Sequence, residues 1–421
     1  MTSVRGLPCP LSTIAISTLL VVALGAGTVL ADPATEEGKS LRSVVELAMR
    51  ANPEVRRARV EVEAAELARR GASAPTSNPA ISVEGGPRFG ADGPQADIGV
   101  SLEIPFDLGG TSRRRRVAGV ADLDAARARL AGVELQVATR ARVLFAEAVA
   151  ADARLRLAED AVALAEEMER VARRRHELGE VSILEPNFAG LERADAQGAL
   201  LDARVERSQA YRALRALLAL PVDAPLSLTP GPEPTESAPL TLQGLLAQAS
   251  EHPELAAADH ASRTAAADLA VSRGDGAPGL SASAGWSREG DEANLVTGGL
   301  RIELPLQRNQ LGVAEARRAA GVAEIDAEAA GLAVPRDLAA ALDGWVAAAA
   351  RFTLATTDAL PLAEQNLELV LRAYEAGKEE LLAVLLLQRQ ALAARGAAID
   401  AELELHRAAA ALERAVGQEV F

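Results

Sequence analysis

The chain contains very little cysteine and few aromatic residues. Cys9 is its single cysteine, and Phe, Trp and Tyr together make up only 2% of the 421 residues. One thiol excludes an internal disulfide framework, and so few rings exclude a core built around aromatic side chains. Ala, Leu, Arg and Glu dominate instead, which is typical of long, closely packed helices.

An excess of positive charge is also absent, since the formal net charge is −15. The phosphates of a nucleic acid would repel such a chain, so we expect no nucleic-acid partner. The acidic charge suits a soluble surface or the wall of a cation-conducting channel, and solubility explains most of it.

Patterns of catalytic or metal-binding residues are lacking as well. The four histidines, His176, His252, His260 and His406, have no ligand spacing, whereas a metal site needs convergent His, Cys or carboxylate groups. No Gly-rich phosphate loop and no convincing Ser/His/Asp or Cys/His set occurs. We therefore expect neither an enzyme nor a cofactor, and no resident metal.

Residues 1–31 differ from the rest and are interpreted as a signal peptide. Arg5 precedes an apolar stretch from Leu11 to Leu30, and a small-residue cleavage pattern ends at Ala31. The stretch is long enough that an uncleaved membrane anchor is the alternative. Because Cys9 precedes the apolar stretch, the exported chain would have no thiol and would depend on packing or oligomerisation for stability.

The remainder of the chain is an internal duplication. Pro105 and Pro305, each in an apolar-Pro-apolar step, lie 200 positions apart, and Gly179 and Gly377 lie 198 apart. Such constant spacing indicates a repeated structural unit. We expect one repeat over residues 32–220, a Pro-rich linker over 221–240, and a second repeat over 241–421.

Each repeat contains two predicted strands, near 79–86 and 96–104 in the first and near 279–287 and 295–304 in the second. Ile98, Val100, Leu102 and Ile104 alternate with polar or small residues, which is the period of a strand with one apolar face. The expected strand length suits a tilted strand that crosses a bilayer.

Four strands cannot close a barrel, so they form either a small soluble sheet or part of a barrel shared by several chains. Polar loops are expected at Gly85–Pro94 and Ser287–Asn294. Only Phe89, Phe106 and Trp286 lie near the strands, which is sparse for the aromatic girdle of a membrane barrel.

Long helices fill most of the rest. Leu157, Leu164, Val171 and Leu178 lie seven residues apart, a heptad pattern that indicates a coiled coil. The return segment Leu184–Leu220 is the expected antiparallel partner. Pro335 predicts a kink in the corresponding tract of the second repeat.

Three segments carry a family resemblance. They are RRHELGEVSILE at 174–185, RAYEAGKEELL at 372–382 and LEIPFDLGG at 102–110. The first two resemble the turn between the long helices of the TolC-like outer-membrane efflux family, and the third resembles its strand-to-helix transition. The first turn is most similar to the CzcC-type, heavy-metal branch. No single motif is diagnostic, but their order and double occurrence are.

The resemblance implies a mainly α-helical fold with a small β part. It implies a homotrimer whose twelve strands form a barrel in outer-membrane lipid and whose helices form a periplasmic α-helical barrel. Such a protein is a passive duct that works with a periplasmic adaptor and an inner-membrane pump, here with heavy-metal cations as the implied cargo. The alternative is a periplasmic coiled-coil adaptor or stalk with a soluble sheet.

The resemblance also implies a pore entrance at the periplasmic end. Glu185 lies at the position where relatives carry an acidic ring, and three carboxylates there would attract cations. Ser182 and Glu185 also fit a helix-capping box, which needs no pore. At the equivalent second-repeat positions, Ala383 and Leu386 replace the aspartates of some relatives and suggest an apolar constriction.

The turns themselves are candidate contacts for the adaptor, again by resemblance. Gly179 and Gly377 are expected to adopt positive φ at helix C-termini. The remaining candidates are Glu180, Ser182 and Lys378. Arg113–Arg116, directly after the second strand, are interpreted as a solvated helix face. A position at the periplasmic border of the membrane and pairing with nearby acidic helices are the alternatives.

Overall fold

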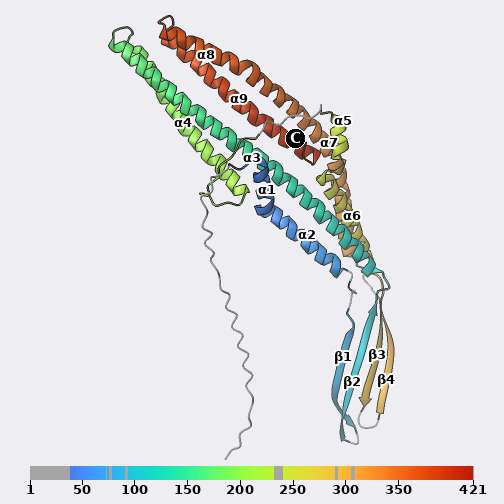
Figure 1. The fold of residues 1–421 in the computed structure, drawn as a ribbon. Helices are drawn as coiled ribbons and strands as arrows, with labels where there is room; N and C mark the ends of the chain where they lie inside the picture. Colours follow the sequence, from blue (N-terminus) through green and yellow to red (C-terminus); the bar gives the residue numbers. More distant parts are fainter. Residues whose placement is uncertain are drawn as a thin grey trace, which may run out of the picture. The chain divides into compact units, whose positions relative to one another are not determined.

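Helices and strands follow one another in the same order in both halves of the chain (Figure 1). A computed structural model describes residues 38–72, 74, 78–90, 93–231, 240–289, 293–304 and 309–420. The predicted signal peptide and residues 232–239 of the predicted linker lie outside these ranges. The first half contains α1 (Leu41–Ala51), α2 (Pro53–Gly71), β1 (Ala80–Gly90), β2 (Gly93–Phe106), α3 (Thr111–Glu177) and α4 (Leu184–Leu217). The second contains α5 (Leu242–Gln248), the 3-10 turn η1 (Ala249–Glu251), α6 (Pro253–Gly274), β3 (Gly279–Glu289), β4 (Ala293–Glu303), α7 (Gln310–Thr353), the π-helical turn η2 (Leu354–Ala359), α8 (Leu360–Glu375) and α9 (Leu381–Val416).

Two buried caps sit at equivalent places in the halves. Asn52 accepts the backbone N–H of Glu54 and donates to the carbonyl of Leu217 (3.1 Å). His252 likewise accepts the N–H of Glu254 and contacts the carbonyl of Arg414 (3.0 Å). Each cap starts one helix and ties it to the end of the return helix, and the following proline fits the first helical turn.

The four strands form one antiparallel sheet in the order β1-β2-β3-β4. All four overlap the predicted segments, but the hairpins extend further than expected. Gly86 pairs with Asp97, and Arg288 pairs with Asn294, so most of the two expected polar loops is strand. Cross-strand pairing here outweighs the low strand preference of Gly and Pro.

The long helix α3 packs along α2, α4, α6 and α9. Its 67 residues span about 100 Å. Of the heptad positions, Leu157, Leu164 and Val171 are half-buried and Leu178 is exposed. The buried residues of this tract are Ala161, Ala165, Met168, Glu169 and Ala172. Small side chains therefore bring the helices close together, with the leucines flanking the seam.

The second repeat departs from regular α-helix at the π-helical turn η2. Helix α7 continues through Pro335, and the irregular turn is η2, just before Pro361. Because Pro361 has no N–H to donate, one backbone hydrogen bond is missing there, which favours a widened turn.

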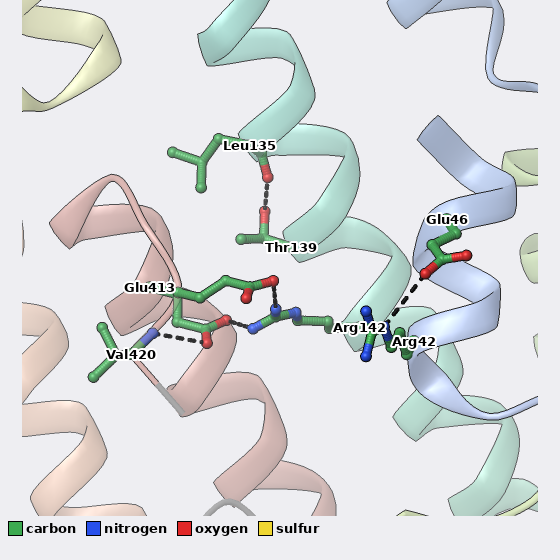
Figure 2. A network of polar contacts seen from close by, with 8 residues as sticks. Arg42, Glu46, Leu135, Thr139, Arg142, Glu413 and Val420 are labelled. Atoms are coloured by element: carbon green, nitrogen blue, oxygen red, sulfur yellow. Dashed lines mark hydrogen bonds and ion pairs between the residues drawn. The ribbon is translucent and has the colours of Figure 1, made fainter. Parts of the chain in front are cut away.

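An ion pair buried between α3 and α9 joins the two repeats. Figure 2 shows Arg142 of α3 directed at Glu413 of α9, whose other carboxylate oxygen accepts the backbone N–H of Val420 (3.2 Å). Glu413 is only 2% exposed. Removing Arg142 would leave the buried carboxylate of Glu413 without its cation, whereas Arg142 also pairs with exposed Glu419 (2.5 Å). The pair therefore favours one relative register of the two helices.

Several helices also expose apolar side chains. Two helical stretches, Gln310–Tyr374 and Leu381–Val416, are long and apolar enough to cross a membrane by length and composition alone. Leu311, Ile325, Leu332 and Val346 of α7 are all exposed. No described residue of the chain covers these faces.

Candidate functional sites at the sheet and the helix tips

One face of the sheet is apolar and exposed on all four strands. Val83, Val100, Trp286 and Val296 lie opposite one another in register, one on each strand. All four are exposed, and Val83 and Val296 are more than 70% exposed. The same face continues through Ile81, Leu102, Ile104, Leu300 and Ile302. Such a face is unfavourable in water and suits lipid.

The opposite face is polar. Ser82 hydrogen-bonds Ser101 (2.7 Å), Glu103 accepts from Ser281 (2.6 Å), and Arg301 pairs with Glu103 (3.1 Å). The alternation of polar and apolar faces, with strands of 11 to 14 residues, matches a membrane-barrel wall.

The aromatic residues lie on the apolar face. Phe89 is at the hairpin end, Phe106 is at the helix end, and Trp286 lies between them; all three are exposed. The two ends of the sheet thus each carry one aromatic ring, at the places where a membrane barrel has its two interfacial girdles.

The two helix turns have the same backbone geometry. Gly179 and Gly377 have φ of 77° and 68°, which confirms the predicted left-handed conformation. In the first turn, the N–H groups of Gly179 and Glu180 donate to the carbonyls of His176 and Arg175. Gly377 and Lys378 repeat these bonds in the second turn. Both are Schellman motifs, which require glycine at this point.

A cation–π contact links the two turns. The guanidinium of Arg175 lies 4.9 Å from the ring centroid of Tyr374, which is only 4% exposed. Tyr374 packs in a cluster with residues of both helical hairpins, including Met168, Ala189 and Leu381. Neighbouring Tyr374, followed by the carboxylates of Glu180 and Glu185, raises the pKa of Arg175, so this residue stays charged.

The sequence did not single out Arg175 and Tyr374 as a pair. Tyr374 could have been recognised from the sequence, because a tyrosine three residues before a turn glycine is unusual in a chain with so few aromatic residues. Their contact depends on how the hairpins pack, which spacing alone does not give.

The capping box predicted at Ser182 and Glu185 is wrong. Helix α4 begins at Leu184, and the Ser182 hydroxyl accepts the N–H of Leu184 (3.3 Å), one position too early for the box. Glu185 instead lies 4.0 Å from Arg175, and one of its carboxylate oxygens is buried without a hydrogen-bond partner in the described structure. Its side chain is 24% exposed.

The two second-repeat candidates differ in exposure. Ala383 is half-buried, whereas Leu386 is 58% exposed and lies one turn after exposed Leu382 on α9. The exposed apolar stripe at this end of α9 fits an apolar constriction or a contact with another chain.

Two of the four histidines, His176 and His252, form hydrogen-bond contacts that stabilise the local backbone. His252 is the helix cap described above, and His176 Nδ1 contacts the carbonyl of Val181 (3.0 Å). Among the described residues, no three His, Cys, Asp or Glu side chains come together as a metal site would require.

Known proteins share this architecture. The model of the outer membrane efflux protein family matches residues 44–220 and 246–418. The chain therefore belongs to this family of outer-membrane efflux channels, as the sequence motifs predicted. The family consists of transport ducts of the outer membrane, with their helical part in the periplasm.

Individual relatives agree with this assignment. The cobalt-zinc-cadmium resistance protein CzcC of Cupriavidus metallidurans is 30% identical over 323 residues, covering 75% of this chain and 76% of that protein. The fold is similar to that of CusC (TM-score 0.75, 20% identity, 90% of this chain and 92% of that one). The outer membrane protein VceC of Vibrio cholerae is also similar (TM-score 0.75, 19% identity, 90% and 97%).

Proposed function

We propose that the chain is the outer-membrane duct of a tripartite efflux system. Three copies pool their sheets into a twelve-strand barrel in the outer membrane, and their helices surround a periplasmic channel. A periplasmic adaptor and an inner-membrane pump complete the system and supply the energy. Residues 32–220 and 241–421 act as the two repeats of each copy.

One observation carries this proposal: the sheet exposes an apolar face on every strand and leaves β1 and β4 as open edges. A four-stranded sheet with these properties is incomplete by itself, since open edges and exposed apolar surface promote association. Closing the edges between copies pairs the backbone and turns the apolar face toward lipid.

The experiment is extraction of the full chain from cell membranes. We expect it in the outer-membrane fraction, running on a gel as a trimer that dissociates into monomers only on heating. Recovery of a soluble monomer would rule out the duct.

The alternative is a periplasmic coiled-coil adaptor or stalk with a soluble sheet. That protein requires at least one strand with a polar outward face. β3, the weakest strand in the sequence, presents Leu280, Ala282, Ala284 and Trp286 outward by its pairing, so even this strand favours lipid.

We further propose divalent heavy-metal cations as the cargo. Support comes from the 30% identity to a cobalt-zinc-cadmium resistance protein. Cells that lack the chain should become sensitive to zinc, cobalt or cadmium salts and regain tolerance when it is restored. Sensitivity only to organic compounds would assign the duct to a different pump.

Glu185, Ala383 and Leu386 are proposed to line the pore entrance, with Glu185 attracting cations. The single-channel cation preference in planar bilayers should fall for Glu185→Ala. Glu159→Ala, on an exposed part of α3 far from the turn, is the matched control. Unchanged selectivity and conductance in Glu185→Ala would remove Glu185 from the pore.

The turns are proposed to meet the adaptor. Both present the same rigid Schellman geometry, which gives the adaptor two equivalent docking points per copy. The contact candidates are Gly179, Glu180, Ser182, Gly377 and Lys378. A photo-crosslinking amino acid at Ser182 or Lys378 should capture the adaptor in cells, whereas the same group at exposed Arg204 should not.

A further inference from the structure

Arginines gather on the four helix segments that border the sheet. Segments 68–71, 107–117, 271–275 and 309–318 contain nine arginines and three carboxylates, although the whole chain has a net charge of −15. We call the nine residues the arginine border: Arg69 and Arg70 of α2, Arg113, Arg114, Arg115 and Arg116 of α3, Arg273 of α6, and Arg317 and Arg318 of α7.

The four helix ends lie together beside the strands (Figure 1). Arg115 of α3 is 3.6 Å from Asp275 at the end of α6. Asn309, before α7, donates to the carbonyl of Ser272 in α6 (3.1 Å). One turn farther along α3, a Cβ built on Gly119 would lie 3.2 Å from the Cα of Arg69 in α2. The arginine border is therefore one continuous band in space.

Most of these charges have no counter-charge among the described residues. Among the nine, and within the described residues, only Arg115 forms an ion pair, and the other eight form none. Farther along α3, Arg127, Arg142 and Arg154 pair with carboxylates, whereas Arg129, Arg140 and Arg156 form no ion pair in the described structure. Unpaired arginines are thus more frequent in the arginine border than along the rest of α3.

Helix electrostatics add to this imbalance. The first turns of α3 and α7 contain no acidic residue, although a helix N-terminus favours negative charge and disfavours cations. At α3, Asp107 accepts the N–H groups of Ser112 (2.7 Å) and Thr111 (2.9 Å). Asp107, together with the Asp275 that pairs with Arg115, does not offset four consecutive arginines, so an external anion would lower the free energy of this segment.

The arginines of α3 also lean toward the sheet. Helical side chains tilt toward the helix N-terminus, which for α3 is the end that adjoins β2. Arg114 accordingly donates to the carbonyl of Gly109 (2.6 Å), and Arg116 donates to that of Ser112 (3.4 Å).

Directly beside the border, apolar surface begins. Phe106, Leu108, Leu304 and Leu311 are all exposed at this junction. Apolar surface followed by a band of cations is the order in which hydrocarbon and phosphate follow each other at the edge of a bilayer.

We propose that the arginine border binds the phosphate groups of anionic phospholipids in the membrane leaflet that faces the helices. This inference rests on the proposed function, which puts the sheet in the membrane. The lipid headgroups supply the missing counter-charge and fix the depth at which the barrel sits.

The test is native mass spectrometry of the detergent-purified full chain, mixed with equal amounts of phosphatidylglycerol and phosphatidylcholine. The variant Arg113→Gln/Arg115→Gln/Arg116→Gln removes three charges from the border. The control, Arg156→Gln/Arg204→Gln/Arg351→Gln, removes three exposed arginines that lie away from the sheet and form no ion pair in the described structure.

Wild type and control should retain phosphatidylglycerol at least about fivefold over phosphatidylcholine, and the border variant should lose this preference. Equal retention of both lipids by wild type, or a preference that survives in the border variant, would overturn the proposal. Displacement of the lipid by millimolar inorganic phosphate would also overturn it, in favour of a free-phosphate site. The same spectra give the mass of the assembly, so failure of the trimer is recorded separately from failure to bind lipid.

Discussion

Arg175 and Tyr374 lie 199 positions apart in the sequence, yet they hold the two helical turns together. The ring provides both packing and a face for the guanidinium, while the phenol oxygen is buried without a hydrogen-bond partner in the described structure. At the scale of single residues, the ring rather than the hydroxyl is therefore the stabilising part of this contact.

We expect Tyr374→Ala to loosen the turns, because loss of a buried aromatic side chain costs about 3–5 kcal/mol. Limited trypsin digestion should cut faster at the arginines near the turn, and the melting temperature should fall. Tyr374→Phe retains the ring and serves as the matched control. Equal effects of both substitutions would contradict this role of the ring.

A second single residue, His406, is expected to make the stability of the fold depend on pH. Burial lowers the pKa of His406 below its ordinary value of 6.5, and the side chain lines an apolar cavity with Phe145 and Leu403. Arg142, Glu402 and Glu413 line this cavity as well.

Because the folded pKa is depressed, the unfolded chain binds the proton first as the pH falls below about 6.5. The stabilisation by neutral His406 is thus present above that pH and is lost as the pH falls through the folded pKa. Wild type should lose more thermal stability than His406→Gln between about pH 7.5 and pH 5.5. Parallel losses would show that His406 does not titrate in this way.

Among the elements, the strands were the easier to predict and the helix starts the harder. The period-two pattern around Ile98–Ile104 placed the faces of β2, because alternation depends on local geometry. The hairpin ends were missed, since Gly85–Pro94 has loop-like composition and pairs only because its partner strand is adjacent. The capping box at Ser182 failed because Glu185 has a nearby cation, Arg175, that the local sequence does not reveal.

Two neighbouring residues of β1 can test which face of the sheet contacts lipid. Val83 lies on the apolar face, and Glu84 lies on the polar face. Val83→Arg should cost about 2–4 kcal/mol in the membrane and reduce trimer yield. Glu84→Arg should assemble normally and reduce cation preference. Similar assembly of the two variants in lipid would argue against a lipid-facing surface.

At the scale of the whole molecule, the duplication could be predicted from prolines and glycines that recur about two hundred residues apart. A repeated fold ends its helices and strands at equivalent positions in each repeat. Asn52 and His252 also occupy equivalent positions, since each caps a helix in its own repeat. The oligomeric state is harder to predict from the sequence. The alternation of apolar and polar residues identifies an apolar face but does not say which molecule covers it. The open edges β1 and β4 and the apolar helix faces together indicate further copies of the chain.

The most direct test of this assembly joins the two open edges. Ser82 and Thr297 lie in one register row at opposite edges of the polar face, and Cys9 is the single native cysteine to remove. In a Cys9→Ser background, Ser82→Cys/Thr297→Cys should react with a flexible bis-maleimide to give covalent dimers and trimers, and nothing larger. The single variants should give no trimers. A product that remains monomeric, or a ladder that continues past three chains, would contradict a closed ring of three copies.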